Sequence, residues 1–124
     1  MDRKPRIRAV RGATTVTADD AGEILSATAE LLTALARENG VDGTSLISAI
    51  FTVTPDLRAA FPATAARQLG WTELPVLCAT EIPVPGSLER CIRVLLHIEF
   101  DADVVPRHVY LRRATTLRPD LAYE

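Results

Sequence analysis

The sequence contains few cysteines and few aromatic residues. Cys78 and Cys91 are the only cysteines among 124 residues. They form no CxxC pair and have no histidine at ligand spacing, so they do not form a zinc motif. No secretory signal precedes them, and we therefore expect two free thiols. Only 5% of the residues are aromatic, so the core must consist mainly of Ala, Val, Leu and Ile.

Long apolar segments are also absent. No apolar run approaches the roughly 20 residues that span a bilayer. The charged N-terminal stretch MDRKPRIR is not followed by the apolar region of a signal peptide. These features predict a cytoplasmic protein that binds no membrane. The net charge of −2 gives no electrostatic reason to expect binding to nucleic acid.

Motifs for the common types of catalysis are missing too. The chain has no serine in a nucleophile elbow, no glycine-rich phosphate loop and no HExxH pair. Cys78 has no base partner in the sequence, which favours a buried structural thiol. His97 and His108 are expected to be structural or surface residues. We therefore expect no metal, no cofactor and no acid–base or covalent catalysis.

The pattern of apolar residues predicts one domain, residues 1–124, with the element order β-α-β-α-β-β-β. This order is typical of an α+β fold in which a mixed sheet carries helices on one face. The expected strands are 6–17, 46–54, 74–82, 90–100 and 107–113, and the expected helices are 18–39 and 63–69. The segment from about 114 to 124 is polar and broken by proline, which predicts a mobile tail.

The helix over 18–39 has the clearest start and stop signals. Either Thr17 followed by Asp20, or Asp20 followed by Glu23, supplies an N-terminal cap, and Gly40 is a C-terminal stop.

Charged residues occur in or beside apolar strands, and nearly all the basic ones are arginine. Arg11, Glu81 and Arg93 lie in predicted strands, and Arg118 lies in the tail. A solvated sheet face with weak surface ion pairs explains this pattern. An arginine-lined pocket for a small polycarboxylate explains it as well, because guanidinium donors bind carboxylates in pairs. Spacing alone favours the solvated face, and the arginine content by itself can reflect genomic base composition.

Six segments occur in order between residues 8 and 121, namely RAVRGATT, TPDLRAAFPATAAR, GWTELPVLCATE, CIRVLLH, RHVYL and LRPDL. Together they resemble the monofunctional Bacillus-type (AroH-class) chorismate mutases. The resemblance implies a homotrimer that forms a pseudo-α/β-barrel, with active sites between neighbouring subunits. It also implies an isomerase of the shikimate pathway that converts chorismate to prephenate for phenylalanine and tyrosine biosynthesis.

This reaction accounts for the missing motifs. It is a Claisen rearrangement within one molecule, which requires no nucleophile, proton shuttle, metal or cofactor. The protein has to hold the enolpyruvyl side chain folded over the ring. It also has to stabilise negative charge on the ether oxygen, because the C–O bond breaks ahead of C–C bond formation.

The resemblance assigns roles to individual residues of this sequence. Arg93 corresponds to the arginine that meets the ether oxygen and one carboxylate, and Arg11 to a second carboxylate ligand. Glu81 corresponds to the acceptor of the ring hydroxyl, Tyr110 to a carboxylate contact, and Cys78 to a pocket-lining thiol. The other expected substrate-binding residues are Leu77, Ala79 and Thr80 beside Cys78, Phe61, Ala63, Thr64 and Arg67 of the adjoining subunit, and Leu117 and Arg118 of a tail that settles over the site.

Two positions depart from the family pattern. Thr64 stands where the family has a lysine, and Leu77 stands where it has a threonine. The missing rim charge is expected to weaken substrate affinity more than the chemical step. Two other classes of protein stay open: a non-catalytic trimer that binds a small carboxylate, and a small hydrolase or enamine/imine deaminase of a related trimeric fold. The joint presence of Arg11, Glu81, Arg93 and Tyr110 favours the mutase.

Overall fold

Strands and helices follow the order that the sequence predicts. The computed structural model describes residues 5–101 and 104–118. The elements are β1 (Arg6–Thr15), α1 (Ala21–Asn39), β2 (Leu46–Val53), α2 (Ala63–Gln68), β3 (Val76–Thr80), β4 (Cys91–Phe100) and β5 (Val109–Tyr110), with short 3₁₀ helices at Gly43–Ser45 and Arg112–Thr116. None of the helices in this described part is long and apolar enough to cross a membrane.

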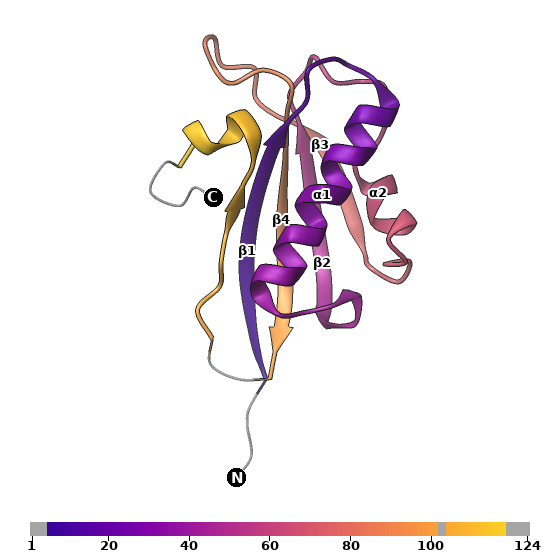
Figure 1. Cartoon of the computed structure of the whole chain (residues 1–124), viewed down its shortest axis with the longest axis vertical. Coiled ribbons are helices and arrows are strands. Elements are labelled where there is room, and N and C mark those ends of the chain that lie inside the picture. Colours follow the sequence, from indigo (N-terminus) through magenta and orange to yellow (C-terminus); the bar gives the residue numbers. More distant parts are fainter. Residues whose placement is uncertain (1–4, 102–103, 119–124) are drawn as a thin grey trace.

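The strands form one mixed sheet in the order β3-β2-β4-β1-β5. The long central strand β4 is antiparallel to both β1 and β2, whereas β3 runs parallel to β2 and β5 parallel to β1. Both α-helices lie on the same side of this sheet (Figure 1). The predicted α+β fold with helices on one face is therefore confirmed.

The core lies between this sheet face and α1. Alternate residues of β4 are buried on the helix side, including Val94, Leu96 and Ile98, and Leu31 and Leu35 of α1 pack against them. A fully buried side chain of this kind contributes about 1.5–3 kcal/mol relative to an exposed one. The core is mainly aliphatic, as the low aromatic content predicts.

Helix α1 begins three residues later than the apolar pattern predicts. Asp20 is the N-cap residue: its backbone is extended, with φ −128° and ψ 129°, and its carboxylate accepts a hydrogen bond from the Glu23 N–H. The Glu23 carboxylate in turn accepts hydrogen bonds from the backbone N–H groups of Thr17 and Ala18, at 2.7 and 3.2 Å. These contacts hold residues 17–20 outside the helix. At the other end Gly40 has φ 63°, a left-handed conformation that glycine adopts without strain.

The strand predicted over 107–113 is too long. Only Val109 and Tyr110 pair with β1. Before them, Arg107 exchanges backbone hydrogen bonds with the Asn39 side chain. After them, Arg112 takes a left-handed φ of 55°, which ends the extended conformation and starts the 3₁₀ helix.

The remaining boundaries differ by one or two residues, as at β1, which ends at Thr15, and β3, which spans Val76–Thr80. Of the tail predicted over 114–124, residues 119–124 lie outside the described part of the chain.

Candidate active site

The sheet face opposite the helices holds the side chains of interest. Residues that pair across neighbouring strands point to the same side of a sheet. Arg93 of β4 pairs with Ala13 of β1 on one side and with Thr52 of β2 on the other. Two residues further along β4, Leu95 pairs with Arg11 and Ile50. The long-range register of three strands therefore brings Arg11, Thr52 and Arg93 to one face.

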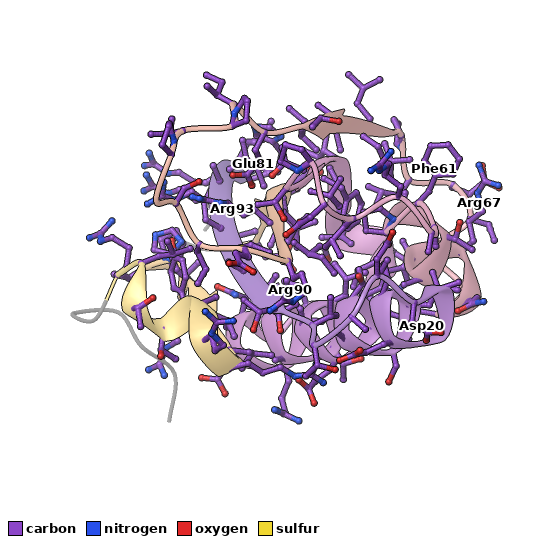
Figure 2. All side chains as sticks on the ribbon, turned by 90° about the horizontal axis from the view of Figure 1, so that it is seen from above. Asp20, Phe61, Arg67, Glu81, Arg90 and Arg93 are labelled. Atoms are coloured by element: carbon purple, nitrogen blue, oxygen red, sulfur yellow. The ribbon has the colours of Figure 1, made fainter. Side chains whose placement is uncertain are left out.

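Glu81 and Arg93 form an ion pair at the end of this face. Glu81 immediately follows β3, and its backbone N–H donates to the Val53 carbonyl at 2.9 Å. The Arg93 Nε lies 2.9 Å from Glu81 Oε2, and the Arg93 side chain is 43% exposed against 16% for Glu81. Figure 2 shows the two residues next to each other. The sequence predicts both as site residues, and the fold brings them into contact.

Thr52 is the third member of this group. Its hydroxyl donates a hydrogen bond to the same Glu81 Oε2 at 2.6 Å. The Arg93 Nε atom is buried, but its N–H forms no aligned hydrogen bond with any described residue. The arginine is therefore held by charge at a short distance, whereas the threonine is held by a directed hydrogen bond.

A cavity of about 250 Å³ opens beside Arg93. It brings together three residues that the sequence predicts for the site, Arg11, Arg93 and Tyr110. Tyr110 is almost fully buried, and Arg11 is exposed. The other lining residues, which the sequence analysis missed, are Gly12, Ile50, Thr52, Val94 and Leu95. The alternation along β2 and β4 carries the signal for Ile50, Thr52 and Leu95, but only once the pairing register is known. Gly12 and Val94 face the helices, so alternation gives no signal for them.

His108 supports the backbone of Arg11. Its Nδ1 accepts a hydrogen bond from the Arg11 N–H at 3.0 Å. Partial burial lowers the pKa of His108 below its usual value, and the nearby positive charges of Arg11 and Arg118 lower it further. His108 is therefore a structural residue, as expected, but one that contacts a predicted site residue. Because the charge of Arg118 contributes to this lowered pKa, Arg118 lies near His108.

The segment after β5 lies along the same end of the molecule. Leu117 packs against a buried cluster that includes Ala13, Tyr110 and Ala114. Two residues of the predicted tail, Leu117 and Arg118, thus lie close to Tyr110 and His108 respectively.

The two cysteines are free, as predicted, but they differ in burial. Cys78 is exposed, so the interpretation as a buried structural thiol is wrong. It lies on β3 at the edge of the sheet, where few neighbours can cover it. Cys91 is the buried thiol, and burial raises its pKa to about 11, which makes it a poor nucleophile at neutral pH.

Cys78 belongs to a second cavity of about 370 Å³. Phe61 also lines it, together with the predicted residues Ala79 and Thr80. Leu77, the next residue back along β3, is 70% exposed and pairs with Ile50.

The predicted residues around α2 lie away from Arg93 in the same chain. Phe61 is 71% exposed, and Figure 2 shows Phe61 and Arg67 on the opposite side of the molecule from Glu81 and Arg93. Ala63 is buried against the core, and the Thr64 N–H donates to the Phe61 carbonyl at 3.1 Å. One chain therefore presents the predicted site residues as two separate groups.

The donor set of the first group suits an anionic organic ligand. Two guanidinium groups, a phenol and one carboxylate can bind carboxylates and one hydroxyl. No group of three or more His, Cys, Asp or Glu side chains that could hold a metal ion occurs among the described residues. The fold is that of a small α+β protein, and its helix-free sheet face carries a cavity lined by two arginines and a tyrosine.

Comparison with known proteins identifies the family. The sequence model of type I chorismate mutases matches residues 7–121, and the chain belongs to this family. It is 52% identical to "Chorismate mutase AroH" of Thermus thermophilus over 118 residues, which cover 93% of this chain and 96% of that protein. It is 44% identical to the Bacillus subtilis protein of the same name over 119 residues, covering 94% and 93%.

A solved structure agrees with these relatives. A chorismate mutase from Clostridium thermocellum has a TM-score of 0.85 and 52% identity to this chain, covering 88% of this chain and 98% of that one. The family resemblance of the six motifs is therefore confirmed in both sequence and fold.

Proposed function

We propose that this member of the chorismate mutase family rearranges chorismate to prephenate in the biosynthesis of phenylalanine and tyrosine. The observation that carries the proposal is the partly exposed guanidinium of Arg93, held 2.9 Å from Glu81 beside a cavity that Arg11 and Tyr110 also line. Family membership supplies the substrate, and this group of side chains matches the substrate's carboxylates, ether oxygen and ring hydroxyl.

Orientation of the substrate is the first catalytic task. Chorismate reacts only when its enolpyruvyl group lies over the ring, and a flexible molecule in water seldom holds that shape. Arg11 and Tyr110 would bind carboxylate oxygens from one side of the cavity. Fixing the reacting carbon atoms in this way removes much of the entropic barrier before the chemical step.

Charge stabilisation is the second task. The ether oxygen becomes negative as the C–O bond breaks, and Arg93 would donate a hydrogen bond to it there. Its charge is permanent and its donors lie in one rigid plane. The Arg93 side chain is 43% exposed and borders the cavity, so part of the guanidinium can meet a ligand oxygen while Nε stays beside Glu81. Glu81 would accept the hydrogen bond of the ring hydroxyl.

We propose that the complete site forms between subunits of a cytoplasmic homotrimer. Phe61 and Arg67 are exposed and lie on the far side of the chain from Arg93, so a neighbouring copy can bring them to it. The helix-free sheet face supports the same assembly, since Ile50 and Leu77 are 38% and 70% exposed on it. Burial of that face in an oligomer would stabilise so small a chain.

A non-catalytic trimer that binds a small carboxylate is the alternative. Such a protein needs arginines for its ligand, but it does not need Glu81 to be placed beside Arg93. The hydrolase and deaminase interpretation has less support, since the family match extends over residues 7–121.

The direct test is to mix the purified protein with chorismate and to follow the loss of ultraviolet absorbance, with prephenate confirmed as the product. We expect acceleration above the spontaneous rate in wild type and in Arg37→Ala, which removes an exposed arginine on α1. Loss of acceleration is expected in Arg93→Ala. A wild-type rate equal to the spontaneous rate would rule the proposed activity out, and prephenate binding without turnover would favour the alternative.

A further inference from the structure

We propose that Thr52 is a positioning residue that turns the Glu81 carboxylate toward the substrate. The inference rests on the proposed function and adds a residue that the motif resemblance does not include. Thr52 is the last residue but one of β2, and its hydroxyl donates to Glu81 Oε2 at 2.6 Å. This distance is that of a strong hydrogen bond to an ionised oxygen.

Both contacts of the Glu81 carboxylate fall on one oxygen. Thr52 Oγ1 and Arg93 Nε each approach Oε2, at 2.6 and 2.9 Å. No hydrogen bond from a described residue reaches Oε1. That oxygen is left to accept a hydrogen bond from a ligand hydroxyl. Thr52 thus determines which carboxylate oxygen is available.

Thr52 fixes the orientation of the Glu81 carboxylate more firmly than Arg93 does. It pairs with Arg93 on one side and with Ala79 on the other, so its backbone is fixed between two strands. Its side chain is β-branched and has restricted rotation. The Arg93 N–H, by contrast, is not aligned with its acceptor.

Loss of the Thr52 hydroxyl would change the ion pair. The Glu81 carboxylate could then rotate and place both oxygens on the Arg93 guanidinium, which is the preferred arrangement of an isolated arginine–carboxylate pair. Arg93 would lose part of the charge that acts on the ether oxygen, and the ring hydroxyl would lose its acceptor. The effect should therefore fall on kcat.

The test compares Thr52→Val with Thr52→Ser. Valine keeps the shape of threonine without the hydroxyl, and serine keeps the hydroxyl. We expect Thr52→Val to lower kcat for chorismate by about tenfold or more, and Thr52→Ser to stay close to wild type. A purely structural role predicts the reverse order, because valine favours strands more than serine does. The inference would be overturned if the valine variant were as active as wild type. It would also be overturned if the serine variant were less active than the valine variant.

A double-mutant cycle tests whether Thr52 acts on kcat through Glu81. In a Glu81→Gln background, Thr52→Val should lower kcat further by less than about twofold if it acts through Glu81. An undiminished tenfold loss in that background would overturn the positioning role. Unfolding temperatures of all variants, measured by circular dichroism, would show that each one folds.

Prephenate binding separates this inference from the proposed function. If wild type binds prephenate without turnover, the proposed activity fails, and the Thr52 inference then predicts weaker binding by the valine variant and unchanged binding by the serine variant. Unchanged binding by both would overturn it. A wild type that neither turns over chorismate nor binds prephenate would overturn both proposals.

Discussion

At the residue scale, the environment of Arg93 explains how an apolar strand can carry a charged side chain. Its side chain is 43% exposed and lies 2.9 Å from Glu81, so the charge is neither fully desolvated nor unpaired. The neighbouring residues on its strand, Ile92 and Val94, are buried on the other face. The strand therefore contributes to the core with one side and to the site with the other.

Substitution of Arg93 should reduce turnover more than binding. We expect Arg93→Ala to lower kcat by at least about a hundredfold, the usual effect of removing a donor to a developing oxyanion. Arg93→Lys should recover little, because an ammonium on a flexible stem does not reproduce the planar donors of guanidinium. Steady-state kinetics with chorismate would measure both, and a near-normal kcat for the lysine variant would contradict the proposed role.

His108 predicts a pH dependence of stability. Its Nδ1 accepts a hydrogen bond from the Arg11 N–H, which only the neutral ring can do. Burial, with Arg11 and Arg118 nearby, lowers its pKa below 6.5 in the folded chain. As the pH falls, the unfolded chain therefore binds the proton first. The stabilising contribution is complete above pH 6.5 and is lost as the pH falls through the folded pKa.

The measurement is the unfolding temperature of wild type and His108→Asn between about pH 7.5 and pH 5. An asparagine amide oxygen can accept a hydrogen bond but does not titrate. We expect a smaller loss of stability on acidification in the variant. An identical loss in both proteins would show that other groups cause it.

At the element scale, the close approach of α1 to β1 depends on Gly12. A methyl group built there would lie 2.8 Å from Leu35 Cδ1, 3.0 Å from Leu31 Cδ1 and 3.2 Å from the Val109 carbonyl oxygen. Two of these neighbours are leucine side-chain ends that can shift, but the third is backbone. The helix and β5 therefore both constrain this position of β1, next to the predicted site residue Arg11.

Gly12→Ala should destabilise the fold by about 1–3 kcal/mol, the usual cost of an extra methyl group in a packed core. Gly22→Ala is the matched control, since Gly22 lies exposed in the first turn of α1 and its methyl group would meet only Asp20. Alanine favours a helix over glycine, so the control should keep or raise stability. Urea unfolding would measure both, and equal stabilities of the two variants would contradict the packing argument.

At the scale of the whole molecule, the fold leaves the sheet half covered. Both helices lie on one face (Figure 1), and the other face combines apolar residues with the Arg93 group. Single chains expose this surface to water, whereas the proposed trimer would bury it and complete each site with residues of a neighbouring α2.

A charged residue introduced on the helix-free sheet face should dissociate the proposed trimer into single chains. We expect wild type to have three times the mass of one chain in solution, and Ile50→Glu to reduce the mass and the activity together. Ile47→Glu is the control, because Ile47 has the same 38% exposure at the start of β2 and falls in the irregularity of the β2–β4 register. Light scattering after size-exclusion chromatography would measure the mass. A wild-type monomer with full activity would contradict the proposed assembly.

The element order, the fold class and the family could all be predicted from the sequence alone. These depend on local signals: the helical spacing of apolar residues, the Asp20 and Gly40 caps, and motifs such as RGATT and LRPDL. The sequence also predicted Arg11, Glu81, Arg93 and Tyr110, which the fold brings together around one cavity and the ion pair beside it. Element ends were less predictable, because hydrogen bonds such as those of Glu23 and the left-handed turn at Arg112 set them.

Which thiol is buried, and which polar groups support the site, depends on the folded structure. Cys78 and Cys91 both lie in apolar strands, but β3 is at the edge of the sheet and β4 at its centre. Thr52 and Glu81 are 29 residues apart, and Arg11 and His108 are 97 apart. Contacts at such separations depend on strand register and on the order of strands in the sheet, which residue-by-residue patterns do not contain. Arg93 can be found from a motif, but what holds Glu81 beside it depends on the folded sheet.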